Sequence, residues 1–361
     1  MFEQKILLTP GPLCTSASVK NAMQMDMGTR DQEYGSIIEN LQQDLLSLAR
    51  VSEKEFTVVF LQGSGTYGVE SVLTSAIGPL NSVLILANGA YGQRMKQIAE
   101  HAELQYEYHS FDMLNQLPLK EVEEIIKRSK CTHVAFIHDE TTAGVLNDAE
   151  AICAVAKKYH KTTIVDAMSS FGGIPINFED IDYLITSSNK CLHGVPGSAI
   201  IFARISEIEK CKGNCKSLSL DLYEQYEAFA SGKGYRFTSP THVMLALSQA
   251  IKELQEFGGI EKRYARYREL HQRITTFMQE EGFHTLVASN VQAPIITTFV
   301  IPENFNFEEF YDYMKVHGIL LYSGKLPGIE AFRIGNIGDL SDKDIDALEN
   351  YVHAYCKGDR L

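Results

Sequence analysis

Short apolar runs alternate with helix-like segments over residues 50–205, and this alternation limits the fold more than any other feature of the chain. Runs rich in Val, Ile and Leu are typical of strands buried on both faces, and helical connections between such strands make neighbouring strands parallel. The chain therefore predicts an α/β fold, in which a mostly parallel seven-stranded sheet is covered by helices on both faces. The expected strands are residues 56–61, 82–86, 104–108, 133–137, 163–165, 183–185 and 198–202.

The C-terminal part of the chain predicts a second, smaller domain. Residues 241–281 have the spacing of long helices, and mixed strand and helix patterns return after Phe299. A chain of 361 residues is also long for a single core. We expect a large domain over residues 16–250 and a small α/β domain over residues 251–361, with residues 1–15 packed against the small domain.

Composition disfavours several classes of partner. The formal net charge of −13 argues against nucleic acids and anionic membranes. No apolar run reaches the length of a membrane span, and the first residues lack the basic and apolar regions of a signal peptide. The seven cysteines are scattered without a Cys-x-x-Cys pair. We therefore expect a cytoplasmic protein with reduced thiols and no metal site.

An acid and a lysine follow two of the expected strands. Asp166 ends the run 162–165, and Lys190 follows the run 181–186. In open α/β sheets, side chains beyond the carboxyl ends of the strands line the ligand crevice. Pyridoxal phosphate requires both residue types, a lysine for a Schiff base and a carboxylate for the pyridinium nitrogen. The pair alone is a weak signal, because a strand-end Asp and a loop Lys are common in α/β proteins.

Residues 63–68 (Gly-Ser-Gly-Thr-Tyr-Gly) follow the first expected strand and open a helix, and they match the pattern of dinucleotide-binding loops. That fold requires an acidic residue at the end of the next strand, where this chain has Asn88. A nicotinamide-dependent dehydrogenase is therefore a distant alternative. A Walker loop is excluded because no Gly-Lys-Ser or Gly-Lys-Thr follows the glycines. Ser64, Gly65 and Thr66 could bind one phosphate at the helix N-terminus, or they could form an ordinary cap with a tight turn.

Further polar and aromatic residues lie just beyond other expected strands. Tyr91 follows the second strand and could stack on a heteroaromatic ring, although structural packing is the more common role of a lone tyrosine. Thr142 follows the fourth strand and could donate a hydrogen bond to a phenolate oxygen. Asn189, next to Lys190, could bind a phosphate or satisfy a turn. The run 138–140 (His-Asp-Glu) contains metal-ligand types, but adjacent residues of an extended chain point in different directions, which disfavours a metal.

Arg333 lies in an apolar, glycine-rich segment near the C-terminus. An arginine is costly to bury unless it meets an anion, and its guanidinium fork suits a carboxylate. The acid could belong to a ligand or to a buried salt bridge.

In their order along the chain, these segments resemble the class V aminotransferases, a branch of the fold-type I pyridoxal-phosphate enzymes. The resemblance covers nearly the whole chain, and agreement of many segments in one order is more specific than any single motif. The segments are 8–12 (Leu-Thr-Pro-Gly-Pro), 62–66 (Gln-Gly-Ser-Gly-Thr), 90–94 (Ala-Tyr-Gly-Gln-Arg), 140–144 (Glu-Thr-Thr-Ala-Gly), 165–170 (Val-Asp-Ala-Met-Ser-Ser) and 188–190 (Ser-Asn-Lys).

The resemblance implies a role for each candidate residue. Lys190 would form the Schiff base and then act as the base of the proton shift, and Asp166 would pair with the pyridinium nitrogen. Tyr91 would stack on the ring, and Thr142 would bond the ring oxygen. The phosphate would be held by Ser64, Gly65, Thr66, Asn189 and, from the second subunit of a homodimer, Thr238. Many relatives have Trp at the stacking position, and this chain contains no Trp, so stacking would be weaker here.

Segments 27–34, 236–242 and 332–338 are similar to the branch of the family that transfers the amino group of 2-aminoethylphosphonate to pyruvate. This similarity implies phosphonoacetaldehyde and L-alanine as products. Arg333 would then bind the acidic group of the substrates. Arg30 is a candidate second donor to the phosphonate, or instead a partner of nearby carboxylates.

Two alternatives within the same cofactor chemistry stay open. An alanine- or serine-glyoxylate aminotransferase would use the same residues with a different amino donor. A cysteine desulfurase is less favoured, because it would need a nucleophilic cysteine in the C-terminal domain and residues 320–328 contain none.

Overall fold

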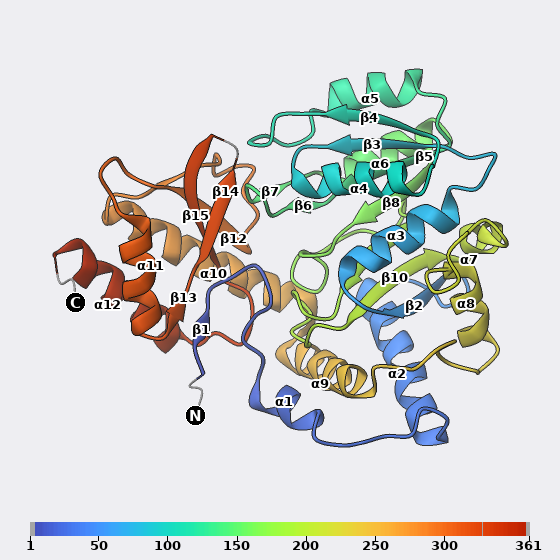
Figure 1. Cartoon of the computed structure of the whole chain (residues 1–361), viewed down its shortest axis with the longest axis horizontal. Helices are drawn as coiled ribbons and strands as arrows, with labels where there is room; N and C mark the ends of the chain where they lie inside the picture. Colours follow the sequence, from blue (N-terminus) through green and yellow to red (C-terminus); the bar gives the residue numbers. More distant parts are fainter. Residues whose placement is uncertain (1–3, 327, 359–361) are drawn as a thin grey trace.

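A seven-stranded sheet forms the centre of the larger part of the molecule (Figure 1). The computed structural model describes residues 4–326 and 328–358. The strands are β2 (Phe56–Gln62), β3 (Val83–Ala87), β4 (Tyr106–Ser110), β5 (His133–Ile137), β8 (Thr162–Asp166), β9 (Tyr183–Ser187) and β10 (Ser198–Arg204). Their order is β2-β10-β9-β8-β5-β3-β4; β10 is antiparallel to both neighbours, and the other neighbouring pairs are parallel. The predicted α/β class with a mostly parallel seven-stranded sheet is confirmed.

Helices cover both faces of this sheet, because successive strand residues point to opposite sides. Val58 and Phe60 of β2 belong to one buried cluster, and Val59 and Leu61 to the other. The first cluster includes residues of α2 (Gln32–Ala49), α5 (Leu119–Arg128), α6 (Ala149–Lys158) and α9 (Thr241–Phe257), and the second includes residues of α3 (Gly65–Ala76), α4 (Ala90–His101), α7 (Ile205–Ile208), η1 (Glu209–Cys211) and α8 (Leu222–Ala230).

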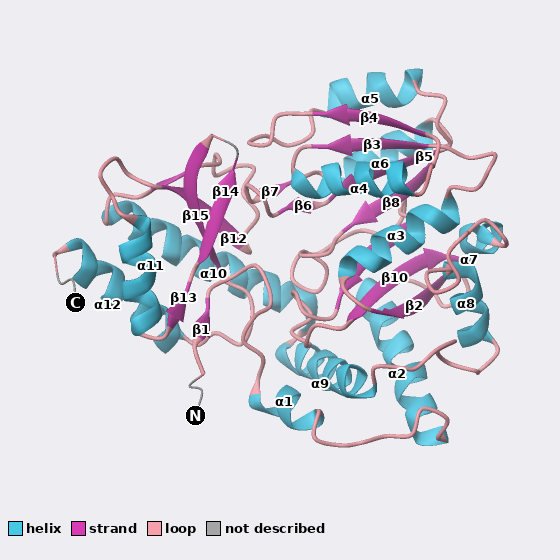
Figure 2. Cartoon of the chain, viewed as in Figure 1, coloured by secondary structure: helices cyan, strands magenta, loops and turns pink. Residues whose placement is uncertain are grey.

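A four-stranded antiparallel sheet, in the order β11-β12-β15-β14, forms the smaller part of the molecule (Figure 2). Its core is rich in buried aromatic side chains, among them Phe283, Phe299, Phe310 and Phe332. The elements are β11 (His284–Thr285), β12 (Ile296–Val300), β14 (Tyr322–Leu326), β15 (Ile329–Gly335), α10 (Gly259–Glu280), α11 (Phe307–Val316) and α12 (Asp342–Cys356).

The N-terminal segment and a short hairpin connect the two parts. Strand β1 (Ile6–Leu7) pairs in parallel with β13 (Ile319–Leu320), and α1 (Ala17–Ala22) packs on α9 of the larger part. The hairpin of β6 (Asp139–Glu140) and β7 (Val145–Leu146) leaves the larger sheet, and Val145 bridges to Gln292 of the smaller part. Among residues 4–326 and 328–358, no helix combines the length and apolar character that crossing a membrane requires.

Candidate active site

Lys190 and Asp166 lie at the carboxyl edge of the larger sheet, beyond two neighbouring parallel strands. Asp166 is the last residue of β8 and pairs with Ile137 of β5, and Lys190 follows shortly after the end of β9. The buried Asp166 carboxylate accepts a hydrogen bond from the N–H of Met168 at 2.9 Å. The structure thus brings the predicted lysine and acid to one edge, while their roles stay predictions.

Burial changes the acid–base behaviour of both groups. It raises the pKa of Asp166 to about 7; the Glu140 carboxylate adds to this rise, and Arg94 and Lys190 oppose it. Burial also lowers the pKa of Lys190, against the opposing charges of Asp139 and Asp166. Lys190 therefore reaches its neutral amine form at lower pH than an exposed lysine does, and a cation placed beside Asp166 would favour the carboxylate form.

The N-terminal segment covers the Lys190 side chain. Nζ of Lys190 donates a hydrogen bond to the carbonyl oxygen of Pro10 at 2.6 Å. Gly11 has φ +111°, and a Cβ at this position would lie 2.7 Å from both Cδ and Nζ of Lys190. The positive φ favours glycine at this position, and a Cβ would also displace the end of the lysine side chain. Sequence reasoning missed this contact, for which the available signal is a glycine between two prolines.

The turn before α3 has the features of an anion site. Ser64 is the N-cap of the helix and does not use its side chain for the cap, so its hydroxyl is available. Gly65 lies so close to Met168 that a Cβ would overlap the Sδ atom. Nη1 of Arg94 donates to Oγ1 of Thr66 at 3.4 Å and brings a positive charge to the turn. Backbone N–H groups at a helix N-terminus, two hydroxyls and a guanidinium together suit a phosphate.

Two polar side chains beside Lys190 complete this edge. Ser187, the last residue of β9, has a buried hydroxyl for which the described residues supply no hydrogen-bond partner. Asn189 is half-buried and directly precedes Lys190. An unpaired buried hydroxyl costs about 1–3 kcal/mol, and a ligand with acceptor oxygens at this edge would remove that cost.

Glu140 connects the segments that carry Tyr91 and Thr142. Its buried carboxylate accepts a hydrogen bond from the Tyr91 N–H at 3.1 Å through Oε2. Through Oε1 it accepts from the Thr142 hydroxyl at 2.5 Å and from the Thr142 N–H at 3.2 Å. The guanidinium of Arg94 lies 4.9 Å from the centroid of the Tyr91 ring. Sequence reasoning missed Glu140 as a positioning residue, although a buried acid between two candidate segments is a usable signal.

Arg333 reaches the same segment from the smaller part of the molecule. It lies on β15, is 9% exposed, and donates from Nη1 to the carbonyl oxygen of Thr141 at 2.7 Å. Its guanidinium carbon lies 4.6 Å from the centroid of the Tyr322 ring. Burial lowers the pKa of Arg333, with the nearby Tyr91, Tyr322 and Glu140 opposing the change. A buried cation thus faces the loop that carries Thr142.

Arg30 and Thr238 lie outside this cluster. Both are exposed, and they line a separate cavity of about 1380 Å³ together with Asp31 and Arg236. The residues that line this cavity include neither Lys190 nor Asp166. Within one chain, the structure therefore does not bring these two candidates to the sheet edge that carries Lys190.

The side chains of the run His138-Asp139-Glu140 do not converge on one point. Nδ1 of His138 is hydrogen-bonded to the Ser170 hydroxyl at 2.9 Å, and Oδ2 of Asp139 accepts from the Ser169 hydroxyl at 2.8 Å. Glu140 binds the first turn of α4. In the part of the chain that the structure describes, no three His, Cys, Asp or Glu side chains are arranged to hold a metal ion.

Comparisons with known proteins extend these observations. The family model described as aminotransferase class-V matches residues 15–330. The chain is 46% identical over 358 residues to the 2-aminoethylphosphonate–pyruvate transaminase of Phocaeicola vulgatus, covering 98% of this chain and 99% of that protein. It is 45% identical over 352 residues to the Bacillus cytotoxicus protein of the same name, covering 96% of each. It is also 46% identical over 356 residues to a Clostridioides difficile bifunctional phosphonoacetaldehyde hydrolase/aminoethylphosphonate transaminase, and spans 56% of that longer protein.

Two solved structures share the fold at low sequence identity. The ureidoglycine-glyoxylate aminotransferase of Bacillus subtilis has a TM-score of 0.92 at 22% identity, over 98% of this chain and 93% of that chain. The alanine–glyoxylate aminotransferase of Nostoc sp. has a TM-score of 0.91 at 22% identity, over 98% of this chain and 95% of that chain. At this identity, the two likenesses concern the fold alone.

Proposed function

The chain belongs to the class V aminotransferase family, and we propose that it transfers the amino group of 2-aminoethylphosphonate to pyruvate, giving phosphonoacetaldehyde and L-alanine. The observation that carries the proposal is the pair of the half-buried Lys190 and the buried Asp166, at one sheet edge beside a helix N-terminus suited to a phosphate. The choice of substrates rests on relatives with 45% and 46% identity over nearly the whole chain, whose names carry this activity.

Pyridoxal phosphate is the cofactor of this family, and the side chains at the sheet edge fit it. The unpaired hydroxyl of Ser187 and the tight glycine turn before α3 support this fit. When bound, the cofactor supplies an electron sink for the amino carbon of the substrate. The residues that would hold it are Ser64, Gly65, Thr66 and Asn189 at the phosphate, Tyr91 and Thr142 at the ring, Asp166 at the ring nitrogen and Lys190 at the aldehyde carbon.

In this proposal, Lys190 is the base of the proton shift. Because burial lowers the pKa of its amine, a larger fraction of the amine is neutral near pH 7 and can accept a proton at Nζ. The carbonyl of Pro10 accepts a hydrogen bond from the same atom and so fixes its position.

Asp166 holds a proton at the ring nitrogen. Burial raises the pKa of its carboxyl to about 7, although Arg94 and Lys190 oppose the rise, and a positive ring nitrogen would lower that pKa further. The resulting charge pair would be buried with Asp166, so solvent would screen it little. The N–H of Met168 keeps one carboxylate oxygen in place.

Arg333 would bind the acidic groups of both substrates. Its buried guanidinium suits a carboxylate or a phosphonate. A phosphonate has more charge and one more oxygen than a carboxylate, so we expect a second donor, for which Arg30 is the candidate. We propose a homodimer, in which Arg30 and Thr238 of one copy complete the site of the other.

A cytoplasmic location belongs to the same proposal. The scattered cysteines suit a compartment that keeps thiols reduced. Fractionation of cells that produce the protein tests this point, and recovery in an exported fraction contradicts it.

The substrate proposal is tested by a panel of amino donors against pyruvate and glyoxylate. We expect 2-aminoethylphosphonate with pyruvate to give the highest kcat/KM, followed as L-alanine formed. Turnover of alanine with glyoxylate, without turnover of the aminophosphonate, would assign the alanine–glyoxylate alternative instead.

Lys190→Ala is expected to remove the activity and the visible absorbance band of the purified protein. We expect kcat to fall by at least about 10³-fold, because the base that moves the proton is lost. The measurement is turnover together with bleaching of the band by borohydride. Lys120→Ala, which replaces an exposed lysine of α5, is the matched control and should keep both properties. Normal turnover in Lys190→Ala would rule out this assignment of the lysine.

A further inference from the structure

Asp139 is a buried carboxyl group that the proposed reaction does not yet use. It is 2% exposed and lies on β6, just beyond the carboxyl end of β5. The N–H of His138 donates to the carbonyl oxygen of Asp166 at 2.8 Å and holds this segment against the end of β8. Asp139 therefore lies at the same sheet edge as Asp166.

Within the described part of the chain, one carboxylate oxygen of Asp139 accepts a side-chain hydrogen bond, and the other does not. Oδ2 accepts the hydroxyl of Ser169 at 2.8 Å. Oδ1 is buried and has no hydrogen-bond partner among the residues that the structure describes. Most buried carboxylate oxygens in folded proteins have a partner, so an N–H donor placed beside Oδ1 would satisfy it.

Lys190 is the candidate cation for Oδ1, because it follows β9 at the same sheet edge and its charge acts on Asp139. The charges around its amine come from Asp139 on β6, Asp166 on β8 and Arg333 on β15, and Asp139 favours the ammonium form more than Asp166 does. Reciprocally, the Lys190 charge lowers the pKa of Asp139, although burial raises it overall to about 7. The neighbouring Cys191 thiol is neutral near pH 7, because burial raises its pKa to about 12.

We propose that Asp139 is a positioning residue whose Oδ1 receives the ammonium form of Lys190. A protonated amine has three N–H donors, and the carbonyl of Pro10 accepts one of them. A second donor reaches Oδ1 of Asp139, which balances the new positive charge in a buried site. The proton stays on Nζ, and no covalent bond of Asp139 changes. The proposal rests on the proposed function only in that Lys190 takes up a proton during turnover.

The first test measures the pKa of the Lys190 amine in cofactor-free protein, with no substrate present. The rate at which cyanate modifies Lys190 is followed by mass spectrometry of its peptide across a pH series. Asp139→Asn is expected to lower this pKa by about one unit, because a nearby opposite charge stabilises the ammonium. Glu140→Gln is the matched control, since its bonds run to Tyr91 and Thr142, and a smaller shift is expected. An unchanged pKa in Asp139→Asn, or an equal shift in both variants, overturns the proposal.

A kinetic readout separates this electrostatic role from a structural one. A base must be neutral to accept a proton, so a lower pKa of Lys190 moves the acidic limb of the kcat profile to lower pH. We expect this shift in Asp139→Asn and Asp139→Ser, with KM for the amino donor unchanged, and recovery of the wild-type limb in Asp139→Glu. A uniform loss of kcat at every pH overturns the proposal. A wrong amino donor would be detected in the substrate panel and leaves the cofactor-free titration unaffected, so the two proposals fail separately.

Discussion

At the residue scale, burial sets the charge state of the site before any ligand arrives. Burial raises the pKa of Asp139, Glu140 and Asp166 and lowers that of Lys190. Each group is thereby moved toward its neutral form, which is the form that burial tolerates. A cofactor with a positive ring nitrogen and a negative phosphate would restore the charges. The site therefore gives up stability in the cofactor-free protein in exchange for function.

The Asp166→Asn variant is expected to be more stable than the wild type above pH 7, when both lack cofactor. The folded-state pKa of Asp166 is about 7, and the unfolded-state pKa is about 3.9. Below pH ~4 the carboxyl is neutral in both the folded and the unfolded state, and the stability that the raised pKa contributes is fully present. This contribution is lost as pH rises through ~7. Asn does not titrate, so its advantage grows across this window and reaches on the order of 1–2 kcal/mol after the cost of burying the amide. Urea unfolding at pH 5 and pH 8 measures the difference.

Asp166→Asn is also expected to lower kcat by about 10²–10³-fold, because a neutral amide does not hold a proton at the ring nitrogen. Lys120→Ala again serves as the control, since an exposed lysine should change neither property. Equal destabilisation at both pH values, or an unchanged kcat, would assign Asp166 a structural role.

Some residues of the site could be predicted from the sequence, and others could not. Asp166 and Lys190 follow buried strands of one sheet, so local patterns suffice to place them at one edge. Glu140 binds the Tyr91 N–H across 49 residues of sequence, and Lys190 binds the Pro10 carbonyl across 180. Contacts of this kind depend on how the loops pack, which apolar periodicity does not encode.

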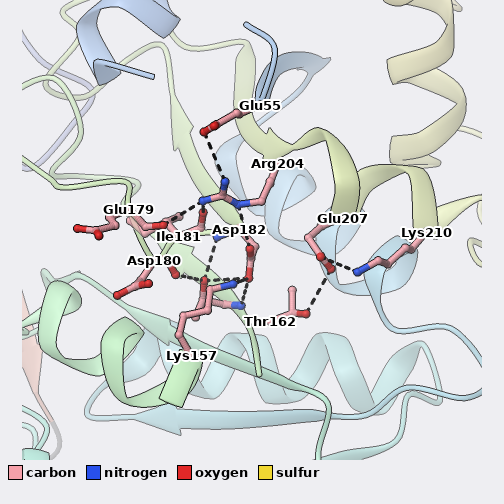
Figure 3. A network of polar contacts seen from close by, with 11 residues as sticks. Glu55, Lys157, Thr162, Glu179, Asp180, Ile181, Asp182, Arg204, Glu207 and Lys210 are labelled. Atoms are coloured by element: carbon pink, nitrogen blue, oxygen red, sulfur yellow. Dashed lines mark hydrogen bonds and ion pairs between the residues drawn. The ribbon is translucent and has the colours of Figure 1, made fainter. Parts of the chain in front are cut away.

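At the scale of elements, a buried charge network holds the sheet at the edge opposite the site (Figure 3). Asp182 is 1% exposed and immediately precedes β9. Its Oδ2 accepts hydrogen bonds from Nζ of Lys157 on α6 at 2.5 Å and from the N–H of Thr163 on β8 at 2.9 Å. Its Oδ1 lies 3.3 Å from Nε of Arg204 at the end of β10. One carboxylate thus connects three strands and a helix.

Asp182→Asn is expected to lower the free energy of unfolding by about 3–5 kcal/mol, because it leaves two cations without their buried partner. Chemical denaturation at pH 7 measures the loss, and the visible band of the folded fraction should be unchanged. Glu55→Gln is the matched control. Glu55 contacts Arg204 at 3.7 Å from an exposed position, so we expect a loss below about 1 kcal/mol. Similar losses in the two variants would contradict the role of burial.

Most strands were predictable because they are buried on both faces. The run 133–137 coincides with β5, which is buried throughout. The predicted strand 104–108 overlaps β4 (Tyr106–Ser110) but is offset from it by two residues, because apolar periodicity is weak in this half-buried edge strand. The antiparallel direction of β10 was not predicted, because a buried strand has the same residue pattern in either direction.

At the scale of the whole molecule, the site draws on distant parts of the chain. Lys190 follows a strand of the larger sheet, Arg333 lies in the smaller sheet and Pro10 lies in the N-terminal segment. The backbone of Thr9 lies against Gly335, where a Cβ would come within 2.5 Å of the Thr9 carbonyl oxygen. Arg30 and Thr238 do not contribute to this sheet edge within one chain; they line a separate cavity. The proposed homodimer is the arrangement that would give both residues a place in the site.

Hybrid dimers test this arrangement, and we expect them to recover activity that neither parent has. Lys190→Ala lacks the amine, and in the proposed homodimer Thr238→Asp would place a carboxylate against the cofactor phosphate. If Thr238 acts on the site of the other copy, a mixed dimer has one site with both defects and one site with neither. Random pairing makes about half of the dimers mixed, so about a quarter of wild-type activity should return.

The measurement uses co-expressed copies with different affinity tags; the unseparated mixture gives the quarter, and mixed dimers isolated through both tags should show about half of the wild-type kcat per dimer. The matched control pairs Lys190→Ala with Asp166→Asn, two residues that the structure places at one edge of the same chain. Each site of that mixed dimer keeps one defect, because both changes act within their own copy, so activity should stay low. If Thr238 acted within its own chain, the first hybrid would be as inactive as the control. That result would assign Thr238 to the site of its own copy and contradict the proposed sharing of residues between the two subunits.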